Sequence, residues 1–453
     1  MRTLAQRLAD FAAGLGFGAL PAAVVHEVKR RIVDSLGCAF GAWDAEPCAI
    51  ARRTAARFPT ASGATLLGTT IRASPDWAAF ANGCLVRYLD FNDTYLSKEP
   101  AHPSDNIAAT LAVAETEGAS GRDLITAIAL AYEVQCRMCD AVSLRARGWD
   151  HVTYVAFSSA LAAAHLMRLD ARRMEQAVNI AGVSGASLRQ SRVGELSHWK
   201  ACTVAHAARR GVFAALLARE GMSGPAPIFE GEFGFEKLVA GEPLALAVED
   251  WRGFMILRTS IKFWPAEYHA QSAIAAALKL RAQIGDAAQI ESVLVRSHDA
   301  AVDIIGGSPA QRRPASRETA DHSLPYIVAV VLADGEITER QFLPERFRDP
   351  ALLAFVQRVK VERDPELSAL YPGRAGNIVS VRLRDGRVLI ERVDDPPGHA
   401  RAPLSDREVE EKFRTQAEPR LGAARATELL RNVWSLDTME SVRDLLPLAE
   451  LPS

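Results

Sequence analysis

Three Ala-rich segments limit the folds open to this chain more strongly than anything else in its 453 residues. They cover residues 107–114, 155–167 and 201–219, and each has the length and composition of a helix that can be buried. Small side chains also let neighbouring helices approach closely. A polar segment precedes each one and carries His102, His151 or Lys200 in turn. The pattern therefore predicts a helical core with basic side chains near the starts of its helices.

The remainder of the first half is also helical by pattern. Two amphipathic helices are expected within residues 1–40, and further helices at 77–89 and 122–139. No convincing strand occurs before residue 258. We therefore predict an all-helical domain over residues 1–258.

Strand patterns begin only after residue 259. Ile290–Arg296 alternates and is rich in β-branched residues, and Val359–Glu362 is a second short strand. Ile378–Val393 predicts a hairpin that turns at Asp385 and Gly386. These strands are mixed with helices, which predicts a separate α+β domain over residues 259–397.

From Ser405 the pattern is helical again. Residues 398–453 are therefore expected to return to the first domain. The predicted fold class is mostly α, with a large all-helical domain plus a smaller α+β lid domain.

Composition excludes several classes of partner. The chain is 49% hydrophobic and 24% charged, which is typical of a globular protein, and its net charge is −2. This charge predicts neither a nucleic acid nor an anionic membrane surface as the main partner. No segment has about eighteen uninterrupted apolar residues, so no transmembrane helix is expected. The amphipathic N-terminus does not resemble a signal peptide.

Six cysteines are present, and only Cys136 and Cys139 lie close together in sequence. With one remote cysteine, this pair could hold an iron–sulfur cluster. However, the pair lies within a helical pattern without turn residues, which favours two core side chains. Cysteines of this kind indicate a reducing compartment, and we expect a cytoplasmic protein.

The loop of residues 88–106 is the first candidate for a functional site. It carries three acids, Asp90, Asp93 and Glu99. His102 follows, just before the expected helix N-cap at Ser104 or Asp105, and a helix N-terminus favours an anion. Such a loop can bind a carboxylate and transfer a proton. A polar surface loop with a solvated histidine is the alternative interpretation.

Several motifs extend over nearly the whole chain. They are D-F-N-D-T at 90–94, H-P-S-D-N at 102–106, R-V-G-E-L-S-H-W-K at 192–200, P-A-P-I-F-E-G at 225–231, K-F-W-P-A-E-Y-H-A-Q-S-A at 262–273, R-E-T-A-D-H-S-L-P-Y at 317–326 and P-P-G-H at 396–399. Together they resemble the MmgE/PrpD family of 2-methylcitrate dehydratases. The resemblance implies a homodimer, a site in the cleft between a helical domain and a lid, and a lyase that needs no metal, iron–sulfur cluster or other cofactor.

The resemblance also implies which residues line the site. The matching positions in the helical domain and at the start of the lid are Asp90, Thr94, His102, His151, Lys200 and Lys262. Tyr326 matches a tyrosine that the lid contributes. The branch that decarboxylates cis-aconitate resembles this chain at the first six positions but carries a histidine in place of Glu267. The sequence E-Y-H-A-Q at 267–271 resembles the dehydratase branch instead.

The substrate class implied is a small hydroxy-tricarboxylic acid, first of all 2-methylcitrate in propionate catabolism. Dehydration needs a base, a proton donor to the leaving oxygen, and positive charge over the carboxylate that becomes enolate-like. We expect His102 and His151 to divide the base and acid roles, because histidine titrates near neutral pH. Asp90 or Asp93 would orient one imidazole. His151 as a simple helix cap is the alternative.

The other site residues are expected to bind the substrate. Lys200 and Lys262 would bind carboxylates, and Tyr326 could donate to an oxygen. The substrate-binding set is Asp93, Thr94, Lys262, Glu267, His269, Arg192 and Arg317, with Arg374 as a further cation. Alternatives stay open for three of these residues: domain packing for Tyr326, a solvated turn for Arg374, and a core position for His269. Domain packing is also the alternative for His322.

Other functions are compatible with the same residues. The nearest are decarboxylation of cis-aconitate and another hydro-lyase or epimerase reaction on a related di- or tricarboxylic acid. A non-catalytic helical scaffold belongs to a different class, but a scaffold has no need for Asp90, His102, His151 and Lys200 together.

Overall fold

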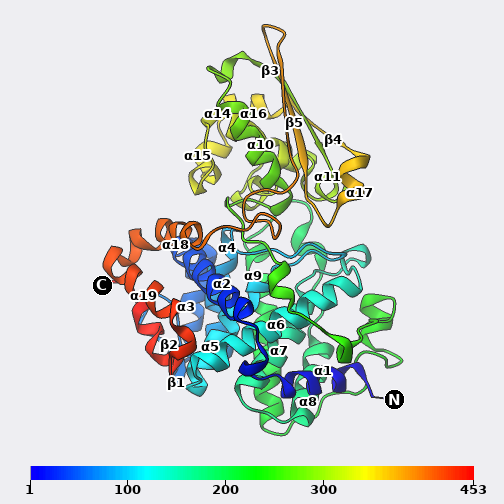
Figure 1. Cartoon of the computed structure of the whole chain (residues 1–453), viewed down its shortest axis with the longest axis vertical. Helices are drawn as coiled ribbons and strands as arrows, with labels where there is room; N and C mark the ends of the chain where they lie inside the picture. Colours follow the sequence, from blue (N-terminus) through cyan, green and yellow to red (C-terminus); the bar gives the residue numbers. More distant parts are fainter. Residues whose placement is uncertain (1, 453) are drawn as a thin grey trace.

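A computed structural model describes residues 2–452 of the chain. Its larger, helical region has the Ala-rich helices at its centre (Figure 1). The helices of this region are α1 (Leu4–Gly14), α2 (Ala22–Gly41), α3 (Glu46–Ala55), α4 (Pro75–Tyr88), α5 (Ile107–Glu117), α6 (Gly121–Ala141), α7 (Thr153–Leu166), α8 (Ala171–Ser184), α9 (Trp199–Arg219), α18 (Asp406–Leu421) and α19 (Ala423–Trp434). Among the described residues, no helix is both long enough and apolar enough to cross a membrane.

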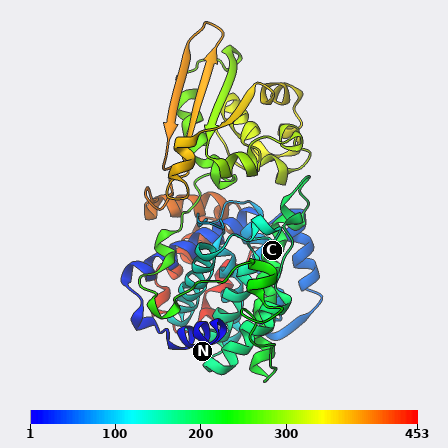
Figure 2. The same cartoon turned by 90° about the vertical axis from the view of Figure 1, so that its right-hand side faces the viewer.

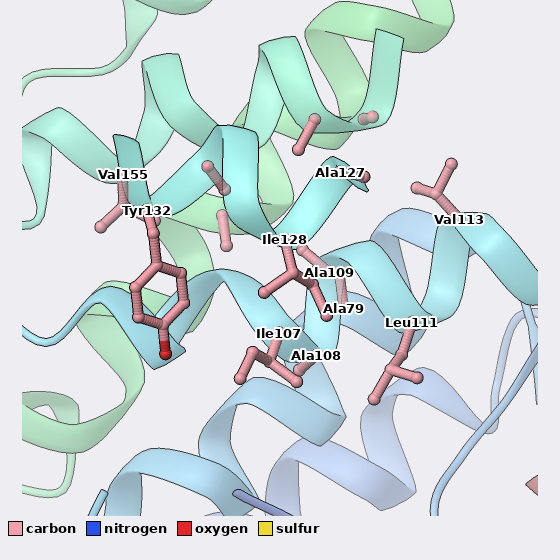
Figure 3. Packing of buried hydrophobic residues seen from close by; sticks show 14 of the residues in the cluster. Ala79, Ile107, Ala108, Ala109, Leu111, Val113, Ala127, Ile128, Tyr132 and Val155 are labelled. Atoms are coloured by element: carbon pink, nitrogen blue, oxygen red, sulfur yellow. The ribbon is translucent and has the colours of Figure 1, made fainter. Parts of the chain in front are cut away.

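Small residues allow α4, α7 and α9 to lie in close contact. A β-carbon at Gly83 of α4 would stand 2.9 Å from the β-carbon of Ala205 in α9. A β-carbon at Gly211 of α9 would stand 2.7 Å from the backbone oxygen of Ala156 in α7. Figure 3 shows the neighbouring part of this core, where small and branched side chains of α4, α5, α6 and α7 fill the space between the helices. The Ala-rich composition is therefore what lets these helices bury one another.

One short sheet in the helical region was not expected. β1 (Pro59–Thr65) and β2 (Arg72–Ala73) form an antiparallel pair, with Thr65 opposite Arg72. The expectation of no strand before residue 258 is therefore wrong at this place. β1 is made of small and polar residues and is largely exposed, so it lacks the alternating β-branched pattern from which a strand is predicted.

The smaller region, here called the lid region, combines a sheet with helices. Its elements are α10 (Gln271–Arg281), β3 (Ile290–Ser297), α11 (Asp299–Ile305), α12 (Pro309–Arg312), α13 (Arg317–Ala320), α14 (Leu324–Asp334), α15 (Pro344–Phe347), α16 (Pro350–Val356), β4 (Val359–Arg363), α17 (Pro365–Leu370), β5 (Asn377–Leu383) and β6 (Val388–Val393). Figure 2 shows the strands of the sheet side by side, with helices beside them. The predicted combination of a large helical part and a smaller α+β part is confirmed.

The sheet has the strand order β4-β3-β5-β6, and only the β3–β4 pair is parallel. The strands predicted from the sequence are confirmed, and the β5–β6 hairpin turns at Gly386, whose φ is 88°. In β5, Val379 and Val381 are buried. Arg382, which follows Val381 towards the turn, is exposed. This alternation gives the sheet one apolar face, which α10 and α14 cover.

The buried apolar residues form two separate clusters. One draws on residues 4–261 and 404–449, and the other on residues 266–383. The predicted domain boundaries, after residues 258 and 397, fall near the two places where the chain passes between the clusters; they stay a prediction. The C-terminal helices lie against the helical region, beside α2 and α3 in Figure 1. Residues from both ends of the chain therefore support the segments that lead into and out of the lid.

Replacing Phe413 by Ala is expected to lower the free energy of unfolding by ~3–5 kcal/mol, the usual cost of removing a buried aromatic ring. Phe413 of α18 is 1% exposed, and its ring lies 6.4 Å from that of Phe40 in α2. Urea unfolding followed by circular dichroism measures the change. Arg407→Ala is the matched control on the same helix, because its side chain is 87% exposed. Equal unfolding midpoints for both variants would show that α18 does not stabilise the helical region.

Candidate active site

A buried carboxylate, Asp90, lies where the helical region meets the lid region. It follows the end of α4 and has a φ of 52°, a left-handed conformation that aspartate tolerates better than most residues. Lys262 Nζ lies 2.8 Å from Asp90 Oδ1, and Lys200 Nζ lies 3.4 Å from Asp90 Oδ2. Arg87 also pairs with Oδ1. Burial opposes ionisation of Asp90, but the surrounding cations outweigh it and hold the pKa of its carboxyl well below the usual value.

A second carboxylate, Asp321 of the lid region, shares these cations. Its Oδ1 lies 3.6 Å from Lys200 Nζ, and its Oδ2 accepts from Arg317 at 3.2 Å. His322 stands between the two carboxylates: Nδ1 is 2.5 Å from Asp321 Oδ1, and Nε2 is 3.2 Å from Asp90 Oδ2. Lys200 Nζ also lies 3.4 Å from His322 Nδ1. This ion network joins the helical region to the lid region.

The side chains of Asp90, Asp321 and His322 are close enough to share a metal ion. However, their oxygens already contact Lys200, Lys262 and an arginine, and positive charge at this density disfavours a further cation. The contacts fit an ion-pair network better than a metal centre.

His102 is held in one tautomer by the backbone. Its Nδ1 lies 2.7 Å from the carbonyl oxygen of Asp93, and because a carbonyl only accepts, Nδ1 carries the proton. Thr94 Oγ1 lies 3.0 Å from the same nitrogen. Nε2 is then the unprotonated nitrogen of the neutral ring. Burial and the nearby positive charges of Arg87 and Lys262 hold the pKa of His102 well below its usual value.

His151 lies beside His102, with ring centroids 5.6 Å apart. Its Nε2 is 3.6 Å from Asp150 Oδ1, and Asp150 in turn accepts from Arg192 Nε at 2.9 Å and from Ser191 Oγ at 2.7 Å. Burial lowers the pKa of His151 to about 3, even though the charge of Asp150 acts in the opposite direction. Both histidines are therefore neutral at neutral pH.

Asp90, His102, His151 and His322 face one cavity of about 290 Å³ between the two regions. The helical region supplies Arg87, Asp90, Glu99, Pro100, His102, Arg145, His151, Arg189, Arg192, Val193, Gly194 and Leu196; the lid region supplies Glu267, His269, Asp303, Ile304, Ser308, Gln311, Thr319 and His322. The volume is near the lower end of the roughly 300–1,000 Å³ of small-molecule sites. A cavity of this size, with charged walls and two neutral imidazoles, can bind a small polyanion and transfer a proton.

Comparison with known proteins shows the family to which the chain belongs. Residues 6–246 match the model of the MmgE/PrpD N-terminal domain, and residues 264–436 match that of the MmgE/PrpD C-terminal domain. The chain belongs to the MmgE/PrpD family. The resemblance found in its motifs is thereby confirmed.

Curated relatives of this MmgE/PrpD protein are named as lyases. A 2-methylcitrate dehydratase of Cupriavidus necator is 32% identical over 85% of this chain and 84% of the relative. One of Salmonella typhimurium is 31% identical over 82% of this chain and 81% of the relative. A human cis-aconitate decarboxylase is 28% identical over 100% of this chain and 96% of the relative. The dehydratases support the enzyme class: this MmgE/PrpD protein is a carbon–oxygen lyase, not a non-catalytic scaffold.

Most predicted site residues of this MmgE/PrpD protein lie together. Six of them line the cavity: Asp90, His102, His151, Arg192, Glu267 and His269. Five others lie behind its wall, where each contacts a residue of the site or its ion network: Asp93, Thr94, Lys200, Lys262 and Arg317, of which all but Arg317 are buried. The two lysines are thus partners of Asp90 and do not face the cavity.

Two predicted residues lie elsewhere. The hydroxyl of Tyr326 donates to the carbonyl oxygen of Gln341, and its ring packs on Phe342 inside the lid core, so this tyrosine does not reach the cavity. Arg374 pairs with Asp394 at 3.2 Å and is partly exposed. Both positions match the alternatives left open by the sequence, domain packing and a surface turn.

Details of the loop before α5 also differ from expectation. The segment Pro103–Asn106 is a 3₁₀ turn, and neither Ser104 nor Asp105 caps α5. Instead, the Ser104 N–H donates to Asp93 Oδ1 at 2.9 Å, and Tyr132 donates to Asp93 Oδ2 at 2.7 Å. The Asp93 carboxylate is therefore used within the loop, and it is the backbone carbonyl of Asp93, not its carboxylate, that orients His102.

Several cavity residues were not expected from the sequence, among them Arg87, Arg145 and Arg189. All three are isolated arginines in helical or turn segments, where a solvated charge is the usual outcome. His322 was weighed only as a packing residue. Asp321 and His322 lie within the R-E-T-A-D-H motif, and an acid next to a histidine at a domain junction is a signal that could have identified both.

Replacing His151 by Gln is expected to make the stability of the protein less sensitive to acid. Folded His151 has a pKa of about 3, whereas the unfolded chain has the ordinary value of roughly 6.5. Between these values the unfolded state binds more protons, so this group lowers the free energy of unfolding by about 2 kcal/mol from pH 7 to pH 5. Urea unfolding of both proteins at the two pH values measures the difference. Parallel losses in wild type and variant would contradict the buried neutral state of His151.

Proposed function

We propose that this protein dehydrates a small hydroxy-tricarboxylic acid, with 2-methylcitrate as substrate and 2-methyl-aconitate as product, as a step of propionate catabolism. The observation that carries the proposal is the pair of neutral imidazoles, His102 and His151, on one wall of a single cavity with cationic residues around them. The relatives named 2-methylcitrate dehydratase support the same reaction.

His102 is the proposed base. Its Nδ1–H is bound to the Asp93 carbonyl, which leaves the Nε2 lone pair free to take the proton next to a substrate carboxylate. The electrons of that C–H bond form the new double bond, and the C–O bond of the neighbouring carbon breaks. A bound trianion would raise the pKa of this imidazole, because negative charge favours its protonated form.

His151 is the proposed acid. It takes up a proton when the trianion binds, because negative charge favours its protonated form, and it then protonates the departing hydroxide so that water leaves. Asp150 lies 3.6 Å from its Nε2 and stabilises the charged ring before it gives up the proton. His322, held between Asp90 and Asp321, lies at the cavity edge, and the arginines that line the cavity supply positive charge for the enolate-like carboxylate.

We also propose that the reaction needs no metal ion or iron–sulfur cluster. Cys136 and Cys139 are buried in α6 within the hydrophobic core, where burial raises the pKa of both thiols well above the usual value. Thiolates of such cysteines are poor candidates for cluster ligands. The acid, base and positive charge that dehydration requires are all available from side chains.

Decarboxylation of cis-aconitate is the second candidate function, since a relative of that name matches the full length of this chain. Glu267 lines the cavity, and the family resemblance implies that the decarboxylating branch carries a histidine at this position, so the glutamate favours dehydration. Burial raises the pKa of the Glu267 carboxyl.

A cytoplasmic location and a homodimer complete the proposal. The six cysteines are all free and buried, which suits a reducing compartment. The dimer is inferred from the family resemblance, and light scattering should give twice the mass of one chain. A monomeric mass at micromolar concentration would exclude it.

His102→Ala and His151→Ala are each expected to lower kcat on 2-methylcitrate by ~10²–10⁴-fold, the usual contribution of a general acid or base. Absorbance of the new conjugated double bond measures the rate. His26→Ala is the control, because that histidine is on the surface, where it pairs with Asp406. A near-normal rate in either site variant would refute the role assigned to that histidine. Carbon dioxide released from cis-aconitate, without dehydration of 2-methylcitrate, would favour the second function.

Prolonged treatment with EDTA is expected to leave kcat unchanged, because no step of the proposed reaction uses a metal. The rate before and after treatment and dialysis measures this. Activity that is lost on treatment and restored by iron and sulfide would overturn the metal-independent mechanism while leaving the reaction itself in place.

A further inference from the structure

Most cations around the cavity are already neutralised by the protein itself. Lys200 and Lys262 contact Asp90, and Arg317 contacts Asp321. Arg87 pairs with Asp90, and Arg192 pairs with Asp150. A charge that is paired in this way holds the site together but has less to offer a substrate carboxylate.

Two cavity arginines are different. Among residues 2–452, the guanidinium groups of Arg145 and Arg189 form no ion pair and no hydrogen bond. Both are only partly exposed, and both line the cavity. Arginine presents a planar set of donors that matches a carboxylate, so an unpaired arginine in a cavity is well suited to bind one.

The backbone fixes these two arginines near each other. Arg145 begins a short 3₁₀ turn, and Arg189 begins another. The two segments are joined by hydrogen bonds from Arg189 N to Gly148 O at 2.9 Å and from Asp150 N to Ser187 O at 2.8 Å. This pairing also carries His151, which follows Asp150. The arginines are thus part of the same rigid unit as the proposed acid.

The acids nearest the arginines do not cancel their charge. Glu99 lines the cavity, but its Oε2 accepts from Ser143 Oγ at 2.8 Å and from the Arg145 backbone N–H at 3.0 Å. Burial raises the pKa of its carboxyl, which favours the neutral form. Asp303, another lining acid, pairs with Arg363 at 2.6 Å on the surface.

We infer that Arg145 and Arg189 together bind one carboxylate of the substrate and so determine the preference of the enzyme for tricarboxylic over dicarboxylic acids. This inference rests on the proposed function for the identity of the substrate class. It replaces the role expected for Lys200 and Lys262, which serve the ion network instead. Selection by an arginine pair is effective because a ligand that lacks the carboxylate leaves both charges without a partner in a partly buried site.

The test compares two unreactive probes, tricarballylate and glutarate, which differ by one carboxylate on the same carbon chain. Isothermal titration calorimetry gives the ratio of their dissociation constants. Wild type is expected to prefer tricarballylate, and Arg145→Gln and Arg189→Gln are each expected to reduce that preference by ~10-fold or more, as for a lost charged hydrogen bond. Arg189→Lys should keep part of it, because the charge remains.

Arg147→Gln is the matched control, since this exposed arginine lies in the same turn as Arg145 but does not line the cavity. It should bind both probes as wild type does. An unchanged preference in both Gln variants, with a wild-type urea midpoint, would overturn the inference.

Binding and turnover separate the two proposals. If the preference for tricarballylate depends on the arginines but no hydroxy-tricarboxylate is dehydrated, the role of Arg145 and Arg189 is supported and the proposed reaction is wrong. If wild type dehydrates 2-methylcitrate and both Gln variants keep the KM of wild type, the proposed reaction is supported and the role of Arg145 and Arg189 is wrong.

Discussion

The ion network centred on Asp90 is the interaction on which the rest of the site depends. A buried carboxylate is costly unless cations and hydrogen bonds compensate it, and removing one partner of such a pair typically costs ~3–5 kcal/mol. Here the partners come from separate segments of the chain: Arg87, Lys200, Lys262 and His322. Because each needs the others, the end of α4, the start of α9 and the first residues of the lid region are held in one arrangement.

This network also decides which residues can meet a substrate. Lysines that satisfy Asp90 are held behind the cavity wall, so the charges open to a ligand are those without a protein partner. Arg145 and Arg189 have that property, and the segment pairing that holds them also holds His151. Binding and proton transfer therefore share one support. The lid region completes the space with His322, Glu267 and His269.

The helical region and the lid region could be predicted from the sequence because the patterns of their helices and strands depend on neighbouring residues. Ala-rich helices and the Gly386 hairpin depend on nearby residues, whereas β1, with small polar residues, has no such signal. Most of the residues that the motif resemblance indicated lie at or behind the wall of one cavity. The resemblance could not tell a residue that faces the cavity from one that supports it, since both belong to the same motif: Lys200 and Tyr326 differ from expectation only in where their polar atoms point.

The low pKa values of the two histidines have a functional consequence. In the empty cavity, burial and nearby cations keep His102 and His151 neutral, so neither is a strong base. A tricarboxylate brings negative charge that offsets those cations, and the pKa of each imidazole then rises. Basicity is thus available only when an anion occupies the cavity. A neutral ligand of the same shape would fill the space but leave His102 unable to hold a proton, so the charge of the substrate itself becomes a requirement for catalysis.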